Sequence, residues 1–383
     1  MFLFLKIVFM FLFSFIFKSY SAEYDWAIVG AGPAGIVVTG LLLDLGVPGN
    51  RIAWIDPKFD VGRLGEHYTT VPGNAKTKLY VEFINSCKTF LDSKSPAILE
   101  LQKYDLEKEY PLHIIVDPLR DISSYMRTLV DSKIATLSSL DFEDNRWSVG
   151  IGDKKIYAQN VVLAHGSHPR SLDYPCNTEI SLDSALKREE LVALVKPTDS
   201  IAVVGSAHSA ILILKFLSEL PVARILNFYN KPLEYAVDMG GWTLNSSSGL
   251  KGITAEFAKT VLEKNSLPNL LRIFNTPESR QAWLPICNKI IYAVGFERNS
   301  LPCINNSTQL TYNDTTGVIA PRLFGIGIAF PDKIVDPLGN TEHRVGLSSF
   351  MNYAQKVVPG WLVTKSLMHR FFIFEELFDI NML

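Results

Sequence analysis

The apolar residues of the chain fall into runs whose lengths predict alternating strands and helices. Residues 24–29 form a compact, mostly apolar run of strand length, and residues 36–45 form an apolar stretch of helix length. Gly46 follows this stretch, as is typical of a residue just beyond a helix C-terminus. Residues 51–56 are a second strand-length run, which ends in the carboxylate of Asp56. Strand, helix and strand in this order predict a parallel sheet of an α/β protein.

The same succession recurs later in the chain. Strand-length runs cover 200–205 and 223–230, and the helix-length run 211–220 lies between them. Ahead of this second unit, residues 120–132 have helical spacing, and residues 144–166 predict a pair of hairpin strands. The pattern therefore predicts two doubly wound units of the same kind.

The first residues differ from the rest of the chain in their hydropathy. Residues 2–17 are almost wholly apolar and end before Lys18. This run is short for a membrane span, which needs about 20 apolar residues. Small residues at Ser19 and Ser21 suit cleavage by signal peptidase. We expect residues 1–22 to be a signal peptide that directs the chain into the secretory pathway, to the periplasm or out of the cell; an uncleaved membrane anchor is the alternative.

The turn of the first unit, Gly-Ala-Gly-Pro-Ala-Gly, has the spacing of a loop that binds the pyrophosphate of a dinucleotide. Gly30 permits the tight turn, Gly32 lets the backbone approach a pyrophosphate, and Gly35 lets the helix pack closely on the strand. The amides of the following helix N-terminus would bind the phosphates. Asp56 lies about 20 residues further on, where a carboxylate binds a ribose diol and disfavours a 2′-phosphate. The bound molecule is therefore FAD or NAD rather than NADP. The residues expected to hold it are Gly30, Gly32, Pro33, Ala34, Gly35 and Asp56.

The turn of the second unit keeps only part of this pattern. Gly205 occupies the first glycine position, whereas Ala207 and Ala210 occupy the second and third. Alanine is tolerated at the third position, but a methyl group at the second crowds the pyrophosphate. The acidic residue is missing, and Lys231 follows the second strand instead. A lysine there suits an adenosine 2′-phosphate, although a solvated loop lysine is the alternative.

We interpret the second unit as a domain for a nicotinamide cofactor, NAD(P)H, with a preference for NADPH. His208 either lines that site or caps the helix start, and the sequence does not choose between these roles. The residues expected to bind the cofactor are Gly205, Ser206, His208, Ser209 and Lys231.

Composition and charge narrow the function further. The chain carries a formal net charge of −2 and has no long run of like charge, so a nucleic-acid partner is not expected. Its cysteines lie far apart and form no Cys-x-x-Cys motif. Neither a redox-active dithiol nor a metal site is therefore indicated.

Three further segments resemble those of the two-dinucleotide-binding-domain flavoproteins, which include flavin-containing monooxygenases, N-hydroxylases and disulfide reductases. Residues 160–175, NVVLAHGSHPRSLDYP, are similar to the family segment that carries Ala-Thr-Gly, here with His165 in place of threonine. Residues 289–302, KIIYAVGFERNSLP, resemble the segment that returns the chain to the flavin domain, and residues 322–332, RLFGIGIAFPD, resemble the last flavin-contacting segment. The resemblance adds these residues to those expected to bind cofactor: Ala164, Gly166, Gly295 and Gly327.

One segment resembles the flavin-containing monooxygenases in particular. Residues 62–77, GRLGEHYTTVPGNAKT, are similar to a segment in which an asparagine lies beside the reactive edge of the flavin. The resemblance assigns this catalytic role to Asn74 and adds Arg63 to the cofactor-binding residues. An amide there can hold an oxygen-derived group where water is excluded, and the alternative is an asparagine that only serves a turn. The monooxygenase fingerprint ahead of the second turn is absent.

The resemblance implies an α/β fold with two doubly wound, Rossmann-like domains, the NAD(P)-binding domain being inserted in the FAD-binding domain. We expect residues 23–172 and 290–383 to form the FAD-binding domain and residues 173–289 the inserted domain. Histidines in segments that approach the flavin are expected to be structural hydrogen-bonding residues rather than proton donors.

For the function, the resemblance implies an FAD-dependent oxidoreductase in which NAD(P)H reduces the flavin and a flavin hydroperoxide, formed with O₂, oxygenates a small N- or S-nucleophile. The flavin carries this chemistry while the protein orients and shields it, so no catalytic triad is expected. Two alternatives remain. One is an NAD(P)H oxidase or reductase of the same fold, and the other is a non-catalytic protein whose second dinucleotide site is degenerate. Membrane association is expected only through the N-terminal segment.

Overall fold

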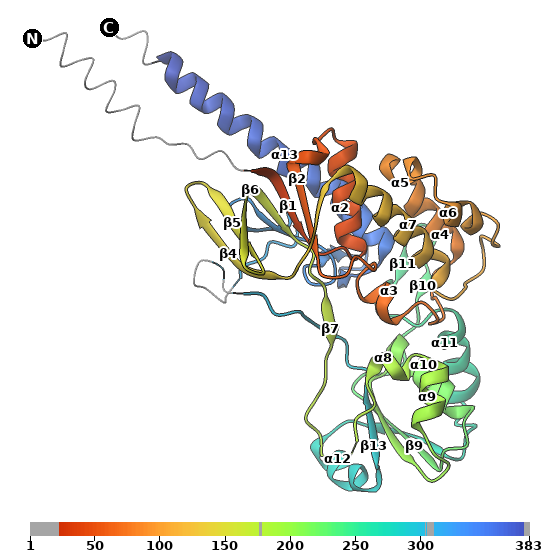
Figure 1. The fold of residues 1–383 in the computed structure, drawn as a ribbon. Helices are drawn as coiled ribbons and strands as arrows, with labels where there is room; N and C mark the ends of the chain where they lie inside the picture. The colour runs from red at the N-terminus through yellow and green to blue at the C-terminus, as the bar shows by residue number, and fades with distance from the viewer. Residues whose placement is uncertain (1–22, 176–177, 303, 305–309, 379–383) are drawn as a thin grey trace, which may run out of the picture.

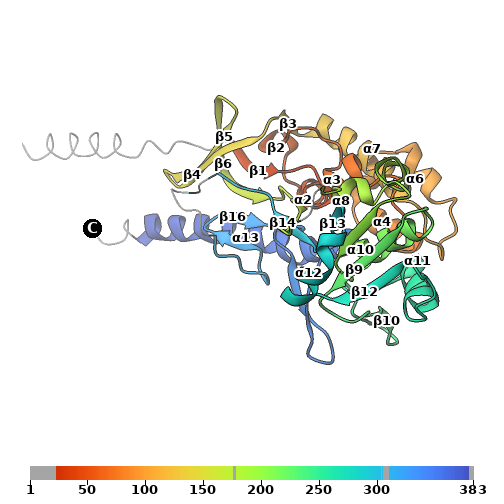
Figure 2. The ribbon, with the colours of Figure 1, turned by 90° about the horizontal axis from the view of Figure 1, so that it is seen from below.

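The computed structural model describes two lobes, which Figure 1 shows one above the other. The described residues are 23–175, 178–302, 304 and 310–378, and of residues 363–378 only the backbone is described. The expected signal peptide, residues 1–22, lies outside this part of the chain, as do Cys176 and Cys303. In the view from below, the β4–β5 hairpin (Leu137–Glu143 and Arg146–Ile151) and the second lobe lie at opposite sides of the molecule (Figure 2).

The first lobe is built on an 8-stranded sheet with a parallel centre. β1 (Tyr24–Val29) runs parallel to β2 (Ile52–Asp56) on one side and to β6 (Lys154–Leu163) on the other. Nearly all residues of β1 and β2 are buried, which explains why their sequences are apolar rather than alternating. The remaining strands are β3 (Asp131–Ile134), β16 (Leu323–Gly325), β15 (Val318–Ala320) and the β4–β5 hairpin, whose β5 pairs with β6.

One face of this sheet is covered by helices. α2 (Pro33–Asp44) is apolar around its whole circumference, which fits its position between the sheet and several other helices. Most of its residues are buried. The other face is covered by the β4–β5 hairpin and by the region around Phe330, so helices flank this sheet on one side rather than on both. The other helices of the lobe are α3 (Arg63–His67), α4 (Thr77–Asn85), α5 (Lys88–Asp92), α6 (Pro96–Leu101), α7 (His113–Leu129) and α13 (Leu347–Phe378).

The second lobe repeats the parallel arrangement on a smaller scale. Its 4-stranded sheet has the order β12-β9-β8-β13, and all neighbours are parallel. The strands are β8 (Ser200–Val204), β9 (Arg224–Tyr229), β12 (Leu270–Phe274) and β13 (Lys289–Tyr292). The helices are α8 (Leu182–Ala185), α9 (Arg188–Leu194), α10 (His208–Ser218), α11 (Gly252–Phe257) and α12 (Pro277–Trp283), and a small ribbon joins β10 (Val237–Asp238) to β11 (Thr243–Leu244).

Two antiparallel strands connect the lobes. β7 (Ser167–Pro169) leaves the first lobe and pairs with β14 (Phe296–Arg298), which returns to it. Because β13 still belongs to the second sheet, the return begins after Tyr292, slightly later than the expected boundary at residue 290. A further hairpin, β17 (Asp332–Val335) and β18 (Thr341–Arg344), follows in the first lobe. The α/β fold with two Rossmann-like units is thereby confirmed.

Candidate active site

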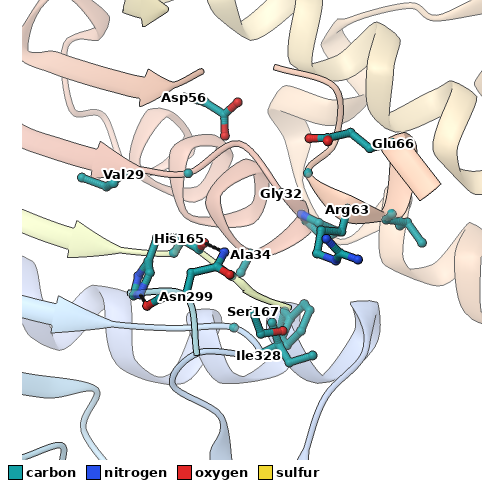
Figure 3. A pocket seen from close by; sticks show the side chains of 18 of the residues that line it. Val29, Gly32, Ala34, Asp56, Arg63, Glu66, His165, Ser167, Asn299 and Ile328 are labelled. Carbon is teal, nitrogen blue, oxygen red and sulfur yellow. Dashed lines mark hydrogen bonds between the residues drawn. The ribbon is translucent and has the colours of Figure 1, made fainter. Parts of the chain in front are cut away.

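A cavity of about 710 Å³ lies at the carboxyl ends of the parallel strands of the first lobe. Ligands of doubly wound folds bind in this position. Figure 3 shows Asp56, Arg63 and His165 at its border, on segments that lie far apart in the sequence. Of the residues expected to contact a cofactor, those that line the cavity are Gly30, Gly32, Pro33, Ala34, Asp56, Arg63, Asn74, Ala164, Gly166 and Gly327.

The glycines of the first loop have different physical roles. A Cβ atom on Gly30, whose φ is +111°, would lie 2.2 Å from the carbonyl oxygen of Ala164. A Cβ on Gly35 would lie 1.9 Å from the carbonyl oxygen of Gly30. Both glycines are therefore required by backbone packing. A Cβ on Gly32 would meet nothing closer than 3.9 Å, so the space above Gly32 is left to a ligand.

The helix after this loop begins without a side-chain cap. Gly32 is the N-cap of α2, Pro33 follows it, and the first turn carries no acidic residue. The first amides of a helix lack partners within the helix, and the helix dipole places partial positive charge there. The start of α2 therefore fits the pyrophosphate of a dinucleotide.

Asp56 ends β2 as a buried carboxylate at the cavity wall. Its Oδ2 accepts a hydrogen bond from the amide of Ala31 at 2.7 Å, and its Oδ1 accepts from the amides of Lys58 and Phe59. These bonds fix the carboxylate, which offers about four acceptor positions in all. Acceptor capacity thus remains for a ribose hydroxyl, and together with Gly32 and α2 the residues present fit an adenine dinucleotide such as FAD.

Arg63 lines the cavity, but its guanidinium bonds to the other lobe. Nη2 donates to Oδ1 of Asp183 on α8 at 2.6 Å, and the hydroxyl of Tyr68 donates to the same oxygen at 2.7 Å. Burial opposes ionisation of Asp183, yet these two donors hold its pKa below the usual range. Nε of Arg63 is buried without a hydrogen-bond partner among the described residues. Arg63 therefore links the cavity of the first lobe to the second lobe.

His165, which replaces the threonine of the family segment, is held by Asn299. Its Nε2 lies 3.1 Å from the carbonyl oxygen of Asn299 and must donate to it, while Nδ2 of the Asn299 side chain donates back to the carbonyl oxygen of His165 at 2.8 Å (Figure 3). Burial lowers the pKa of His165 to about 4, so the ring is neutral at pH 7. Its Nδ1 is consequently an acceptor, and that atom has no partner among the described residues.

A second, smaller cavity of about 150 Å³ lies between the lobes. Asn74 and Leu112 line both cavities, so the two cavities are neighbours on either side of these residues. The first lobe contributes the segment Val71–Asn74 and Leu112, and the second lobe contributes Leu186, His208, Ser209, Leu212, Lys251, Ile253 and Thr254.

The second loop keeps the packing glycine of the first. A Cβ on Gly205, whose φ is +133°, would lie 2.3 Å from the carbonyl oxygen of Ala293. Ala210, at the third position, is fully buried beside it. Ala207, at the second position, is exposed and is the N-cap of α10 without a side-chain cap. His208 does not cap the helix; its ring bonds to Thr254 and lines the smaller cavity.

The expected 2′-phosphate ligand, Lys231, lies exposed beyond β9. A second cation near this strand end is Arg272 on the neighbouring strand β12. Its guanidinium stacks 4.4 Å from the ring of Tyr229, its Nε donates to Oδ1 of Asn227 at 3.1 Å, and its Nη2 is buried without a partner among the described residues. Sequence reasoning missed Arg272, since only the pairing of β12 with β9 brings it to this place.

The remaining expected residues lie outside the large cavity. Gly35 packs under the first loop, and Gly295 lies in the turn before β14, where its carbonyl oxygen accepts a hydrogen bond from the amide of Arg170. Ser206 and Ser209 are partly exposed around the start of α10. In the described parts of the chain, no group of His, Cys, Asp or Glu side chains is arranged to bind a metal ion, and no helix there has the length and hydropathy of a membrane span.

We compared the sequence and the fold with those of known proteins. No protein-family model matches the chain. Flavin-containing monooxygenase from Stenotrophomonas maltophilia has the same fold, with a TM-score of 0.63 at 11% identity over 90% of this chain and 99% of that one. Ornithine N-hydroxylase from Kutzneria sp. 744 gives a TM-score of 0.63 at 12% identity over 90% and 100%. These two likenesses concern the fold.

The decisive comparison is with a relative of known sequence and name. Monooxygenase AgnR1 of Paecilomyces divaricatus is 33% identical, and the alignment spans 88% of this chain and 97% of that relative. The chain belongs to the monooxygenase family of AgnR1. In this monooxygenase the open position at Gly32 and the carboxylate of Asp56 lie in the first lobe, and the degenerate loop lies in the second.

Proposed function

We propose that the large cavity binds FAD, that the second lobe binds NADPH, and that the enzyme transfers one oxygen atom from O₂ to a small N- or S-nucleophile. The observation that supports this most directly is the open space above Gly32 beside the uncapped start of α2 and the buried carboxylate of Asp56. The family assignment supports the oxygen chemistry.

The residues of the cavity suggest how FAD would be held. The first amides of α2 would bind the pyrophosphate, and Asp56 would accept from the ribose of the adenosine half. Nδ1 of His165, a buried acceptor, would accept a hydrogen bond from a hydroxyl group of FAD. Asn74 would lie towards the redox-active end of the flavin. When bound, the flavin supplies hydride acceptance from the nicotinamide and the activation of O₂. The protein contributes orientation and exclusion of water.

For the nicotinamide cofactor, the second lobe offers the amides at the start of α10 and two cations near the end of β9, Lys231 and Arg272. Cations there favour the 2′-phosphate of NADPH over NADH. The methyl group of Ala207 is the feature that opposes tight binding.

The test is anaerobic mixing of the purified yellow protein with NADPH, and separately with NADH. We expect NADPH to bleach the flavin absorbance faster than NADH. When O₂ is then admitted in the presence of a nucleophile, the reduced flavin should be reoxidised with little release of hydrogen peroxide. A flavin that neither nucleotide bleaches would exclude the nicotinamide-dependent reaction, and quantitative release of peroxide would indicate an oxidase instead.

We further propose that residues 1–22 direct the chain into the secretory pathway. The support is the sequence pattern alone: a short apolar run followed by small residues. N-terminal sequencing of protein purified from the native host tests the idea, since a mature chain that begins at Met1 would contradict cleavage.

A further inference from the structure

The large cavity is lined by a buried tyrosine, Tyr80, to which the proposed reaction has given no role. The side chain of Tyr80 is only 5% exposed. Among the described residues, no group forms a hydrogen bond with its hydroxyl; burial and the field of Glu109 are what act on it. A buried hydroxyl without a partner costs free energy. A ligand in the cavity that accepts a hydrogen bond from Tyr80 would remove this cost.

The position of the Tyr80 ring is fixed by the helix that carries it. Tyr80, Phe83 and Ile84 lie three and four residues apart in α4, so they share its buried face and pack in the core of the first lobe. Ahead of α4, the amide of Gly73 donates to the carbonyl oxygen of Tyr110 at 3.0 Å, which holds the preceding loop in place. The hydroxyl is thus a donor whose place is set before any ligand binds.

The hydroxyl of Tyr80 lies at the border between the two cavities. A Cβ atom on Gly73 would lie 3.2 Å from the hydroxyl oxygen. Gly73 and its neighbour Asn74 line the smaller cavity, to which the second lobe contributes, and Asn74 also lines the large one. The hydroxyl therefore lies where the large cavity of the first lobe adjoins the second lobe.

This border is the place where a flavin ring is needed. In the proposed function the pyrophosphate binds at the start of α2 and the adenosine ribose at Asp56, so both ends of the adenosine half are already assigned. The flavin ring must reach the nicotinamide of the other lobe to accept a hydride, and it can do so only where the two cavities adjoin. We infer that the hydroxyl of Tyr80 donates a hydrogen bond to an acceptor atom of the flavin ring and thereby stabilises the reduced flavin. The inference rests on the proposed function.

The chemistry of the phenol suits this role. Burial raises the pKa of Tyr80 to about 12, so the hydroxyl keeps its proton at pH 7 and can donate it in a hydrogen bond. The flavin ring offers carbonyl oxygens and ring nitrogens as acceptors. Two-electron reduction adds negative charge to the ring, and a hydrogen bond to a charged acceptor is about twice as strong as one to a neutral acceptor. Tyr80 would therefore bind the reduced ring more tightly than the oxidised ring, which raises the reduction potential.

The experiment compares the FAD-loaded wild type with Tyr80→Phe, which removes only the hydroxyl. Stepwise reduction with dithionite in the absence of oxygen, beside a dye of known potential, gives the midpoint potential of each. We expect the variant to lose about tenfold in its preference for reduced over oxidised FAD, which corresponds to a potential lower by about 30 mV for a two-electron couple. Its affinity for oxidised FAD should fall about fivefold. The thermal midpoint of the cofactor-free protein should not fall, because no described residue loses a hydrogen bond.

Tyr110→Phe is the matched control. Tyr110 packs against Tyr104, with ring centroids 4.7 Å apart, and its side chain lines neither of the two cavities. This variant should keep the affinity and the potential of the wild type. The inference is overturned if Tyr80→Phe has the wild-type potential, or if Tyr110→Phe lowers the potential as much. A large loss of stability of cofactor-free Tyr80→Phe would also overturn it, since the hydroxyl would then serve the fold.

Failure of the inference can be told from failure of the proposed function, because the experiment uses neither nicotinamide nor O₂. Protein that binds no FAD contradicts the proposed function and the inference together. Protein that binds FAD with the same potential in wild type and Tyr80→Phe contradicts the inference alone.

Discussion

The two glycine-rich loops of this monooxygenase agree at one position and differ at another. A Cβ atom at Gly30 would lie 2.2 Å from the carbonyl oxygen of Ala164, and one at Gly205 would lie 2.3 Å from the carbonyl oxygen of Ala293. The first glycine is thus a packing requirement of each lobe, whatever ligand it binds. The second position is open at Gly32 and carries an exposed methyl group at Ala207. The two loops therefore differ, at the second position, in the space that they leave for a ligand.

The largest expected effect tests the shared position. Gly30→Ala and Gly205→Ala should each lower the free energy of unfolding by about 3 kcal/mol or more, because the backbone is left-handed and the methyl group would meet a carbonyl. Thermal unfolding checks both variants. Gly46→Ala, at φ +83° with no atom within 4 Å, is the control and should cost about 1 kcal/mol. Equal losses of unfolding free energy in all three variants would show that the left-handed backbone, and not the contact of the methyl group with the carbonyl oxygen, causes the destabilisation.

The next effect concerns the position where the loops differ. Gly32→Ala should weaken FAD binding about tenfold or more, since the methyl group would occupy the space left for the pyrophosphate. The thermal midpoint of the cofactor-free protein should stay close to that of the wild type. Flavin fluorescence titration gives the affinity. If the variant binds FAD with the affinity of the wild type, the pyrophosphate does not occupy the open space at Gly32.

The cations of the second lobe come next. Arg272→Gln should raise the KM for NADPH about tenfold and leave that for NADH nearly unchanged, because the proposed site for the 2′-phosphate would lose a cation that stacks on Tyr229. Lys231→Gln, at an exposed position, should change it about twofold. Initial rates of flavin reduction with both nucleotides check this. A larger effect of Lys231→Gln than of Arg272→Gln would assign the binding of the 2′-phosphate to Lys231.

The contact between the lobes gives a pH-dependent test. Asp183→Asn should cost about 1 kcal/mol at pH 7, since Arg63 and Tyr68 lose a charged acceptor. The folded pKa of Asp183 is lowered, so this stability is present above the unfolded pKa and is lost as the pH falls through the folded value. Urea unfolding should show wild type and variant converging below about pH 4. Asp117→Asn, which alters an exposed pair with Arg120, is the control.

The smallest effect would repair the second loop. Ala207→Gly should tighten NADPH binding about threefold by removing the methyl group, less than the loss at Gly32 because Ala207 is already exposed. Titration under anaerobic conditions measures it. Unchanged affinity would show that the second loop does not contact the pyrophosphate.

The sequence predicted those parts of the site that depend on local pattern. Strand, glycine-rich turn, helix and a terminal Asp56 are adjacent in sequence, so their order alone implies the phosphate-binding geometry. The partner of Arg63 could not be predicted, because Asp183 is 120 residues away and meets it only when the lobes come together. Arg272 was missed for the same reason, since only the pairing of β12 with β9 brings it beside Tyr229.

The first lobe is completed by residues at both ends of the described chain. Met351, Ala354, Val358 and Trp361 of α13 pack in the same core as α2, and the indole of Trp361 donates to the carbonyl oxygen of Thr316 at 2.8 Å. The ribosome therefore makes the first glycine-rich loop long before the helix that supports it. The proposed cofactor would be loaded only after α13 has been made, so a chain exported during translation would acquire its flavin beyond the membrane.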